Sequence, residues 1–208
     1  MIERGVLDTK LDNEINAHLF RLKKEAIALG ASDVRIIPAD LVPIEDEIIE
    51  MCSPSCCEQY GKSANCPPHV MTPEDARQWI RPYKSALIFK VDVSPRVLFS
   101  EQGLEIFKKV FLISARLEKL SVEQGHAFSK GLAAGSCKTV FCRDIPCDAL
   151  IKDRKCRYPS LARPSMEALG INVFRLAEEV GWEIHTILRK SDPNDIPSAM
   201  LAGLLLVP

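Results

Sequence analysis

The sequence carries almost no net charge. Its 27 Lys and Arg residues nearly balance 28 Asp and Glu residues, which leaves a formal net charge of −1 and an isoelectric point near 6.4. Such a balance produces no overall field that would attract nucleic acid or an anionic membrane surface. We therefore expect neither nucleic acid nor a membrane among the partners, and look for function in local features.

Long hydrophobic runs are also missing. The longest uncharged apolar run, "IPSAMLAGLLLVP" at residues 196–208, is too short and too bounded by proline to span a bilayer. Residues 1–20 show no basic start followed by an apolar run, the pattern of a secretory signal. The sequence therefore predicts a cytoplasmic protein. In that reducing compartment cysteines serve as thiols or metal ligands more often than as disulfides.

Nucleotide-binding motifs are the third thing the chain lacks. No glycine-rich phosphate loop is present, and "GLAAGS" at residues 131–136 has neither the glycine spacing nor the following helix of a dinucleotide fingerprint. A bound nicotinamide therefore has no support.

Cysteine, by contrast, is abundant and clustered. Of eight cysteines in 208 residues, four lie in "CSPSCCEQYGKSANC" at 52–66 and four in "CKTVFCRDIPCDALIKDRKC" at 137–156. Inert buried thiols are the alternative explanation, but two dense groups in a reducing compartment favour metal or redox chemistry.

The second group has the ligand number of an iron–sulfur cluster. Cys137, Cys142, Cys147 and Cys156 are separated by four, four and eight residues. A [4Fe–4S] or [2Fe–2S] cluster takes four thiolates, whereas structural zinc usually uses two tight pairs. Lys138 to Arg163 contain seven basic residues against three acidic ones. That positive excess would favour an anionic cluster, although a solvated basic loop would look the same.

The first group supplies three cysteines and a spare. Cys52, Cys57 and Cys66 are separated by four and eight residues, and Cys56 adjoins Cys57. Three protein ligands would leave one iron open to water, to His69 or to a small substrate. Two prolines follow Cys66, where they would fix the chain direction and shield sulfur from solvent.

Hydrophobic periodicity predicts one α/β domain over residues 1–208. Its strands and helices alternate, which favours a layered sheet, parallel or mixed, flanked by helices. The cysteine-rich loops are expected at 52–69 and 135–163. The predicted helices are 12–29, 71–84 (with Thr72 as N-cap), 103–125 and 163–182. The predicted strands are 32–42 (one strand, or a pair interrupted by Pro38), 85–93, 127–136 (a strand that runs into a glycine turn), 183–189 and 202–208.

Other polar residues receive less specific roles. His18 and His185 fit packing or surface positions, and His126 the end of a helix. Arg163, Ser165 and Glu167 stand near a predicted helix start, where they would hold an anion or cap the helix. Tyr60 and Gly61 would shape the first loop.

Two segments resemble a known family. "CCEQYGKSANCPPH" and "GSCKTVFCRDIPCDALIKDRKCRYPSLARPSMEALGINV" are similar to the signatures of predicted metal-binding proteins of the DUF2284 family, and the resemblance covers most of the chain. The family usually sets the first cysteines of its second group two residues apart, where this chain has four. The resemblance implies a metal, most simply iron–sulfur, and no particular reaction; Cys56 lies outside the pattern. It implies metal-ligand roles for Cys52, Cys57, Cys66, Cys137, Cys142, Cys147 and Cys156.

Three functions remain open at this point. The first is a redox protein with one or two iron–sulfur clusters, most simply [4Fe–4S], that exchanges electrons with a partner protein. The second is an iron–sulfur oxidoreductase that acts on a small-molecule substrate at an open iron, assisted by Arg163 or His69. The third is a zinc-stabilised binding module. The sequence does not show whether the two cysteine groups meet in one site.

Overall fold

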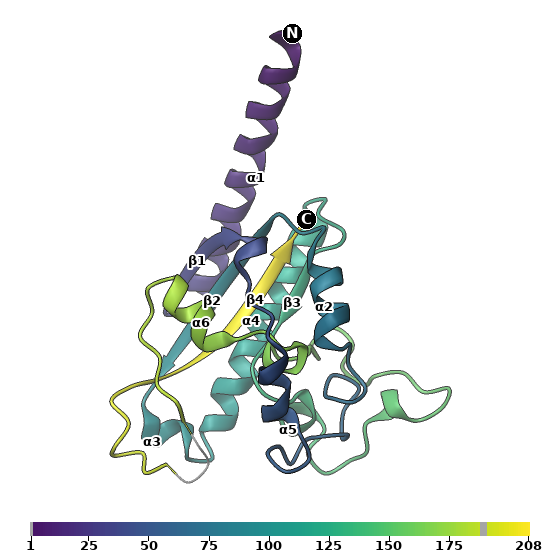
Figure 1. The fold of residues 1–208 in the computed structure, drawn as a ribbon, viewed down its shortest axis with the longest axis vertical. Coiled ribbons are helices and arrows are strands. Elements are labelled where there is room, and N and C mark those ends of the chain that lie inside the picture. Colours follow the sequence, from purple (N-terminus) through teal and green to yellow (C-terminus); the bar gives the residue numbers. More distant parts are fainter. Residues whose placement is uncertain (1, 188–190) are drawn as a thin grey trace.

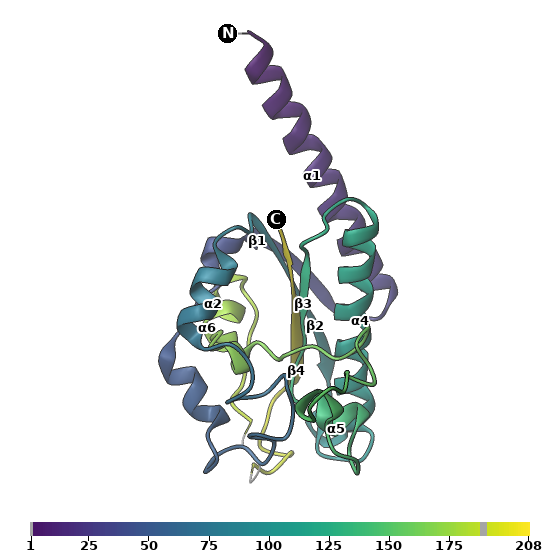
Figure 2. The same ribbon diagram turned by 90° about the vertical axis from the view of Figure 1, so that its right-hand side faces the viewer.

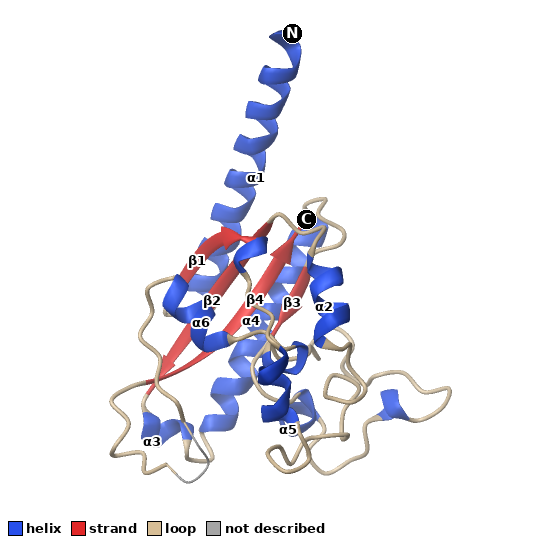
Figure 3. Cartoon of the chain, viewed as in Figure 1, coloured by secondary structure: helices blue, strands red, loops and turns tan. Residues whose placement is uncertain are grey.

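A four-stranded antiparallel sheet forms the centre of the protein (Figures 1 and 3). The computed structural model describes residues 2–187 and 191–208, with side chains from residue 14 onward. The strand order is β1-β2-β4-β3. The strands are β1 (Asp33–Pro38), β2 (Ser85–Val93), β3 (Lys130–Leu132) and β4 (Ala199–Val207).

The predicted parallel or mixed sheet is wrong, because every neighbouring pair is antiparallel. Residues 39–84 return to the sheet end where β1 finishes, so Ser85 pairs with Pro38. The connection through α4 (Gly103–Glu123) does make β3 run in the same direction as β2. The final strand β4 inserts between those two and runs against both. In this split β–α–β unit the order strand, helix, strand is that of a parallel sheet, but the parallel strands β2 and β3 do not pair with each other.

Helices cover both faces of the sheet (Figure 2). One face packs against α4 and the second half of α1 (Ile2–Ala28), whose first half extends away from the body (Figure 1). The other face packs against α2 (Pro73–Ile80) and α6 (Val173–Glu179). The shorter elements are α3 (Pro95–Leu98), α5 (Cys137–Phe141), and the 3-10 helices η1 (Ala39–Leu41), η2 (Asp46–Cys52), η3 (Asp148–Leu150) and η4 (Glu167–Leu169).

The hydrophobic core has two layers, one on each face of the sheet. Leu87 and Phe89 of β2 pack with α1 and α4, while Ala86 and Ile88 of the same strand pack with the α2 and α6 side. All four side chains are fully buried. The alternation predicted for 85–93 is therefore confirmed, and both of its faces are apolar because helices cover both.

The predicted helices over 12–29, 71–84 and 103–125 are confirmed with shifted ends. The helix predicted over 163–182 is broken into η4 and α6 at Gly170, which adopts φ +79°. The strand predicted over 183–189 is wrong for residues 183–187, which form no strand, and 188–189 lie outside the described residues. Within the described part of the chain, no helix combines the length and hydropathy needed to cross a bilayer.

Candidate metal centre

The second cysteine group begins directly beyond the sheet. β3 ends at Leu132, and four residues later Ser136 caps α5, whose first residue is Cys137. The Ala133 N–H donates to Pro164 O at 2.9 Å, which ties the start of this loop to its end. The sheet edge therefore fixes both ends of the cysteine-rich segment.

Four cysteines of this group line one cavity of about 200 Å³. Lys138 closes the loop around it, because its Nζ donates to the carbonyl oxygens of Cys142 and Arg143 at 2.6 and 2.7 Å. Farther along, Arg157 Nε lies 2.7 Å from Asp148 Oδ2. The cysteines are Cys137, Cys142, Cys147 and Cys156, as the sequence grouped them.

The thiols of this group lie close enough together to shift the pKa of Cys142. Burial raises the pKa of Cys142, and the neighbouring Cys137, Cys147 and Cys156 raise it further, while Arg157 lowers it. A bound cation would reverse this effect by displacing the protons. Part of the predicted positive charge is neutralised, since Asp148 pairs with both Arg154 and Arg157.

Three cysteines of the first group line a second, larger cavity of about 460 Å³: Cys52, Cys57 and Cys66. Burial, with smaller contributions from Glu167, Cys57 and Cys66, raises the pKa of Cys52 to about 12. Burial also raises the pKa of Cys66, against the hydrogen bond from Ser136. The raised pKa values of Cys52 and Cys66 favour their protonated thiols at neutral pH, and a bound metal would displace those protons.

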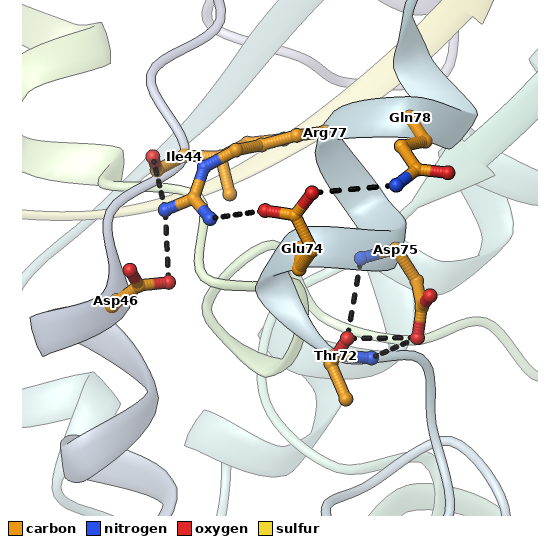
Figure 4. A network of polar contacts seen from close by, with 7 residues as sticks. All are labelled: Ile44, Asp46, Thr72, Glu74, Asp75, Arg77 and Gln78. Carbon is orange, nitrogen blue, oxygen red and sulfur yellow. Dashed lines mark hydrogen bonds and ion pairs between the residues drawn. The ribbon is translucent and has the colours of Figure 1, made fainter.

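The start of η2, the 3-10 helix that ends at Cys52, is tied to α2 by polar contacts (Figure 4). Arg77 of α2 donates through Nη2 to Asp46 Oδ1 at 2.8 Å and to Ile44 O at 3.3 Å. The helix α2 starts with a capping box between Thr72 and Asp75, which confirms Thr72 as the predicted N-cap. The first cysteine loop thus leaves from a fixed point.

The two cysteine groups meet without sharing a cavity. Ser63 Oγ of the first loop lies 3.2 Å from Cys137 Sγ, and Asn65 Nδ2 donates to the same sulfur at 3.4 Å. Cys66 Sγ lies 3.3 Å from Ser136 Oγ. Ser136 and Cys137 are consecutive residues, so the first cysteine loop contacts the second group at one short stretch of chain.

Several other sequence candidates lie away from both cavities. Cys56 is exposed, and hydrogen bonds from Ser53 and Ser55 lower its pKa. His69 is exposed and is not among the residues lining either cavity. Arg163 pairs with Glu118, with Nε 2.9 Å from Oε2, and donates to two carbonyl oxygens. Neither His69 nor Arg163 is placed to assist a reaction in the larger cavity.

The packing position expected for His18 is confirmed. His18 is only 2% exposed, hydrogen-bonds to Gln124 and Ser121, and stacks on His126 with ring centroids 4.0 Å apart. Ser165 Oγ accepts the N–H of Ala168, a residue of η4, at 3.2 Å, while the N-cap position of η4 is Met166.

Sequence reasoning missed the other walls of the larger cavity. His185, expected in a packing or surface position, lines it, as do Phe107 of α4, Phe174 of α6 and Leu201 of β4. Glu167 also lines it, and burial raises the pKa of its carboxyl group. The apolar members gave no signal, since a residue lining a cavity and a residue filling a core follow the same helical or strand period.

Among the described residues, no three His, Cys, Asp or Glu side chains converge closely enough to hold a single metal ion. Both cysteine groups instead surround open volume. A family model described as predicted metal-binding protein (DUF2284) matches residues 35–207. The chain belongs to this family. The DUF2284 match runs from β1 to β4, includes both cysteine groups, and supports metal binding without specifying the metal. Comparisons with curated proteins and with solved structures gave no match.

Proposed function

We propose that this DUF2284 protein is an iron–sulfur redox protein with two centres, one held by four cysteines and one held by three cysteines beside a small-molecule cavity. One observation supports this most: the seven cysteines line two adjoining cavities, four around one and three around the other.

The four-cysteine site fits a cluster by its donors. Its walls bring four thiols and no carboxylate or imidazole among the described residues, and iron–sulfur clusters take thiolates in this number. A bound cluster would supply one-electron transfer. The chain's own part would be to hold the four sulfurs. Asn65 donates a hydrogen bond to the sulfur of Cys137, and Arg157 lies near enough to offset the resulting negative charge.

The three-cysteine site fits a cluster with an incomplete protein shell. The fourth cysteine of that loop, Cys56, is exposed and is not among the residues lining the cavity. A centre held this way keeps one iron accessible. The apolar walls of the larger cavity would then exclude bulk water from that side and bind the molecule that exchanges electrons there.

The contact between the sites supports their working together. Cys66 of one set touches Ser136, which precedes Cys137 of the other. Electrons from a redox partner protein would enter at the four-cysteine side and leave toward the larger cavity. A protein that only carried electrons would have no use for that cavity, and this observation favours the oxidoreductase among the functions left open by the sequence.

The proposal is tested by electron paramagnetic resonance on reduced protein purified without oxygen. Cys147→Ala should remove the signal of one centre and Cys57→Ala the signal of the other. Cys56→Ala, a matched change one residue away, should leave both. Loss of a signal in the Cys56 variant, or loss of both signals in each of the other two, would contradict two separate centres.

A further inference from the structure

The four-cysteine cavity lies close beneath the surface of its own loop, which projects from the body at the lower right of Figure 1. Cys142, Cys147 and Cys156 are partly exposed. Tyr158, which also lines the cavity, is 37% exposed. Its ring stacks on Phe141, and its N–H donates to Cys156 Sγ at 3.4 Å. A molecule that touches the outside of this loop is therefore separated from the cavity by a single side chain.

Apolar side chains lie exposed on the same loop. Ile145 is 41% exposed, and Leu150 and Ile151 are each 38% exposed. Ile145 precedes Cys147 by two residues, and Leu150 follows it by three, so these side chains stand on both sides of a candidate ligand. Exposed apolar groups with charged residues around them are typical of protein–protein interfaces. Burial against a partner would stabilise a complex in proportion to the apolar area removed from water.

The charged residues of this loop are mainly basic. Residues 143–157 contain five basic and three acidic residues. One of the acidic three, Asp148, has a side-chain exposure of only 13% and pairs with Arg154 and Arg157, whereas Lys152 and Lys155 are exposed. Residues 45–58, which lead into the first cysteine loop, are opposite in sign, with five acidic residues and no basic one. The two cysteine loops therefore select partners of opposite charge.

We propose that the exposed side of residues 143–158 is the docking surface for a small acidic electron-transfer protein of the ferredoxin type. This inference rests on the proposed function, since it names the partner that delivers electrons to the four-cysteine centre. The partner's reduced centre gives up one electron and the four-cysteine centre gains it, while no bond forms or breaks. Electron-transfer partners meet over small, weak interfaces, which one loop of this length can supply.

Two double variants with the same change in net charge test the basic part of this surface. Lys152→Glu with Lys155→Glu reverses two charges on the loop. Lys24→Glu with Lys119→Glu, at exposed positions of α1 and α4, is the control. Binding of an acidic [2Fe–2S] ferredoxin is measured by isothermal titration calorimetry at low ionic strength, on protein purified without oxygen. The loop variant should bind at least about tenfold more weakly than the control variant. Equal affinities of the two variants, or an affinity of the unmodified protein that does not fall as salt is added, would overturn the proposal.

A second pair of variants tests the apolar part. Leu150→Ser with Ile151→Ser should weaken ferredoxin binding about tenfold, because the complex would bury less apolar area. Leu41→Ser with Leu112→Ser, at positions 45% and 43% exposed outside the loop, should leave binding unchanged. Equal affinities of these two variants would overturn the docking surface. Single-stranded DNA that binds the loop more tightly than ferredoxin does would also overturn it, in favour of a nucleic-acid partner.

Electron transfer and metal content, measured on the same samples, separate this inference from the proposed function. Dithionite, a small reductant that needs no docking surface, should reduce the four-cysteine centre equally in both charge variants. Reduced ferredoxin should reduce it more slowly in the loop variant alone. Iron and sulfide present with equal ferredoxin rates in both variants would refute the docking surface and leave the two centres standing. Ferredoxin binding that depends on Lys152 and Lys155 in protein without iron and sulfide would support the surface and refute the iron–sulfur assignment.

Discussion

The Ser63 hydroxyl oxygen lies 3.2 Å from the sulfur of Cys137, although 74 residues separate them in the chain. Both side chains are buried, Ser63 to 1% exposure and Cys137 to 7%. The contact joins the first cysteine loop to the first thiol of the second group. It places a polar group of one loop against a candidate ligand of the other.

Replacing Ser63 should therefore change the four-cysteine centre. Hydrogen bonds to a ligating sulfur stabilise the more negative, reduced state of a cluster. Ser63→Ala should lower the reduction potential of that centre, as measured by redox titration with paramagnetic resonance. Ser55→Ala, near the exposed Cys56, is the control, and an equal potential in both variants would contradict the contact's role.

Arg163 should prove structural. Its ion pair with Glu118 is largely buried, with side-chain exposures of 12% and 14%. Removing one partner of such a pair leaves a buried charge, which costs about 3–5 kcal/mol when burial is complete and less here. Arg163→Gln should lower the free energy of unfolding in urea while leaving the spectra of both centres unchanged. Normal stability with an altered spectrum would instead place Arg163 at a centre.

The His18 cluster should make stability depend on pH. Burial lowers the pKa of His18 below its ordinary value of 6.5, with His126 and Arg21 also lowering it and the Gln124 hydrogen bond opposing them. The unfolded chain therefore binds a proton at His18 at a higher pH than the folded chain does. The free energy of unfolding should fall as the pH decreases through about 6.5. In His18→Gln that fall should be smaller, and an unchanged pH dependence of the melting temperature would count against the assignment.

Gly203 of β4 tests the packing of the central strands. It is paired with Phe89 of β2, and an ideal Cβ at Gly203 would lie 2.4 Å from Phe89 Cζ. Gly203→Ala should lower stability by about 1–3 kcal/mol, as overpacking does. Replacing the ring by a smaller side chain, in Phe89→Leu, should reduce the loss of stability that the added methyl group causes. A double-mutant cycle in urea measures this coupling, and strictly additive effects would argue against the β2–β4 register.

The cysteine pattern was the part of the site most accessible from sequence. The spacing separated a group of four from a group of three with Cys56 left over, and the structure gathers the thiols into the same two sets. That they act as ligands stays a prediction. Local spacing works here because each set lies within one short loop, so the chain has little freedom to separate its members.

The missed features depend on contacts far apart in the chain. The sheet is antiparallel because β4, which begins more than a hundred residues after β2 ends, inserts between β2 and β3. No local sequence pattern indicates where such a distant strand will pair. Gly170 breaks a continuous helical pattern by adopting φ +79°, and an ideal Cβ there would lie 3.1 Å from the Glu45 carbonyl oxygen and from Pro73. His185 stood in a strand-like run, and only the packing of that run beside α6 and β4 brings it to the cavity.

The most direct test of the two-centre arrangement is the iron, zinc and acid-labile sulfide content of protein purified without oxygen. Two [4Fe–4S] centres predict about eight iron and eight sulfide per chain, falling to about half in Cys147→Ala and in Cys57→Ala. Zinc without sulfide, retained after attempted cluster reconstitution, would contradict the arrangement and leave a structural metal in its place.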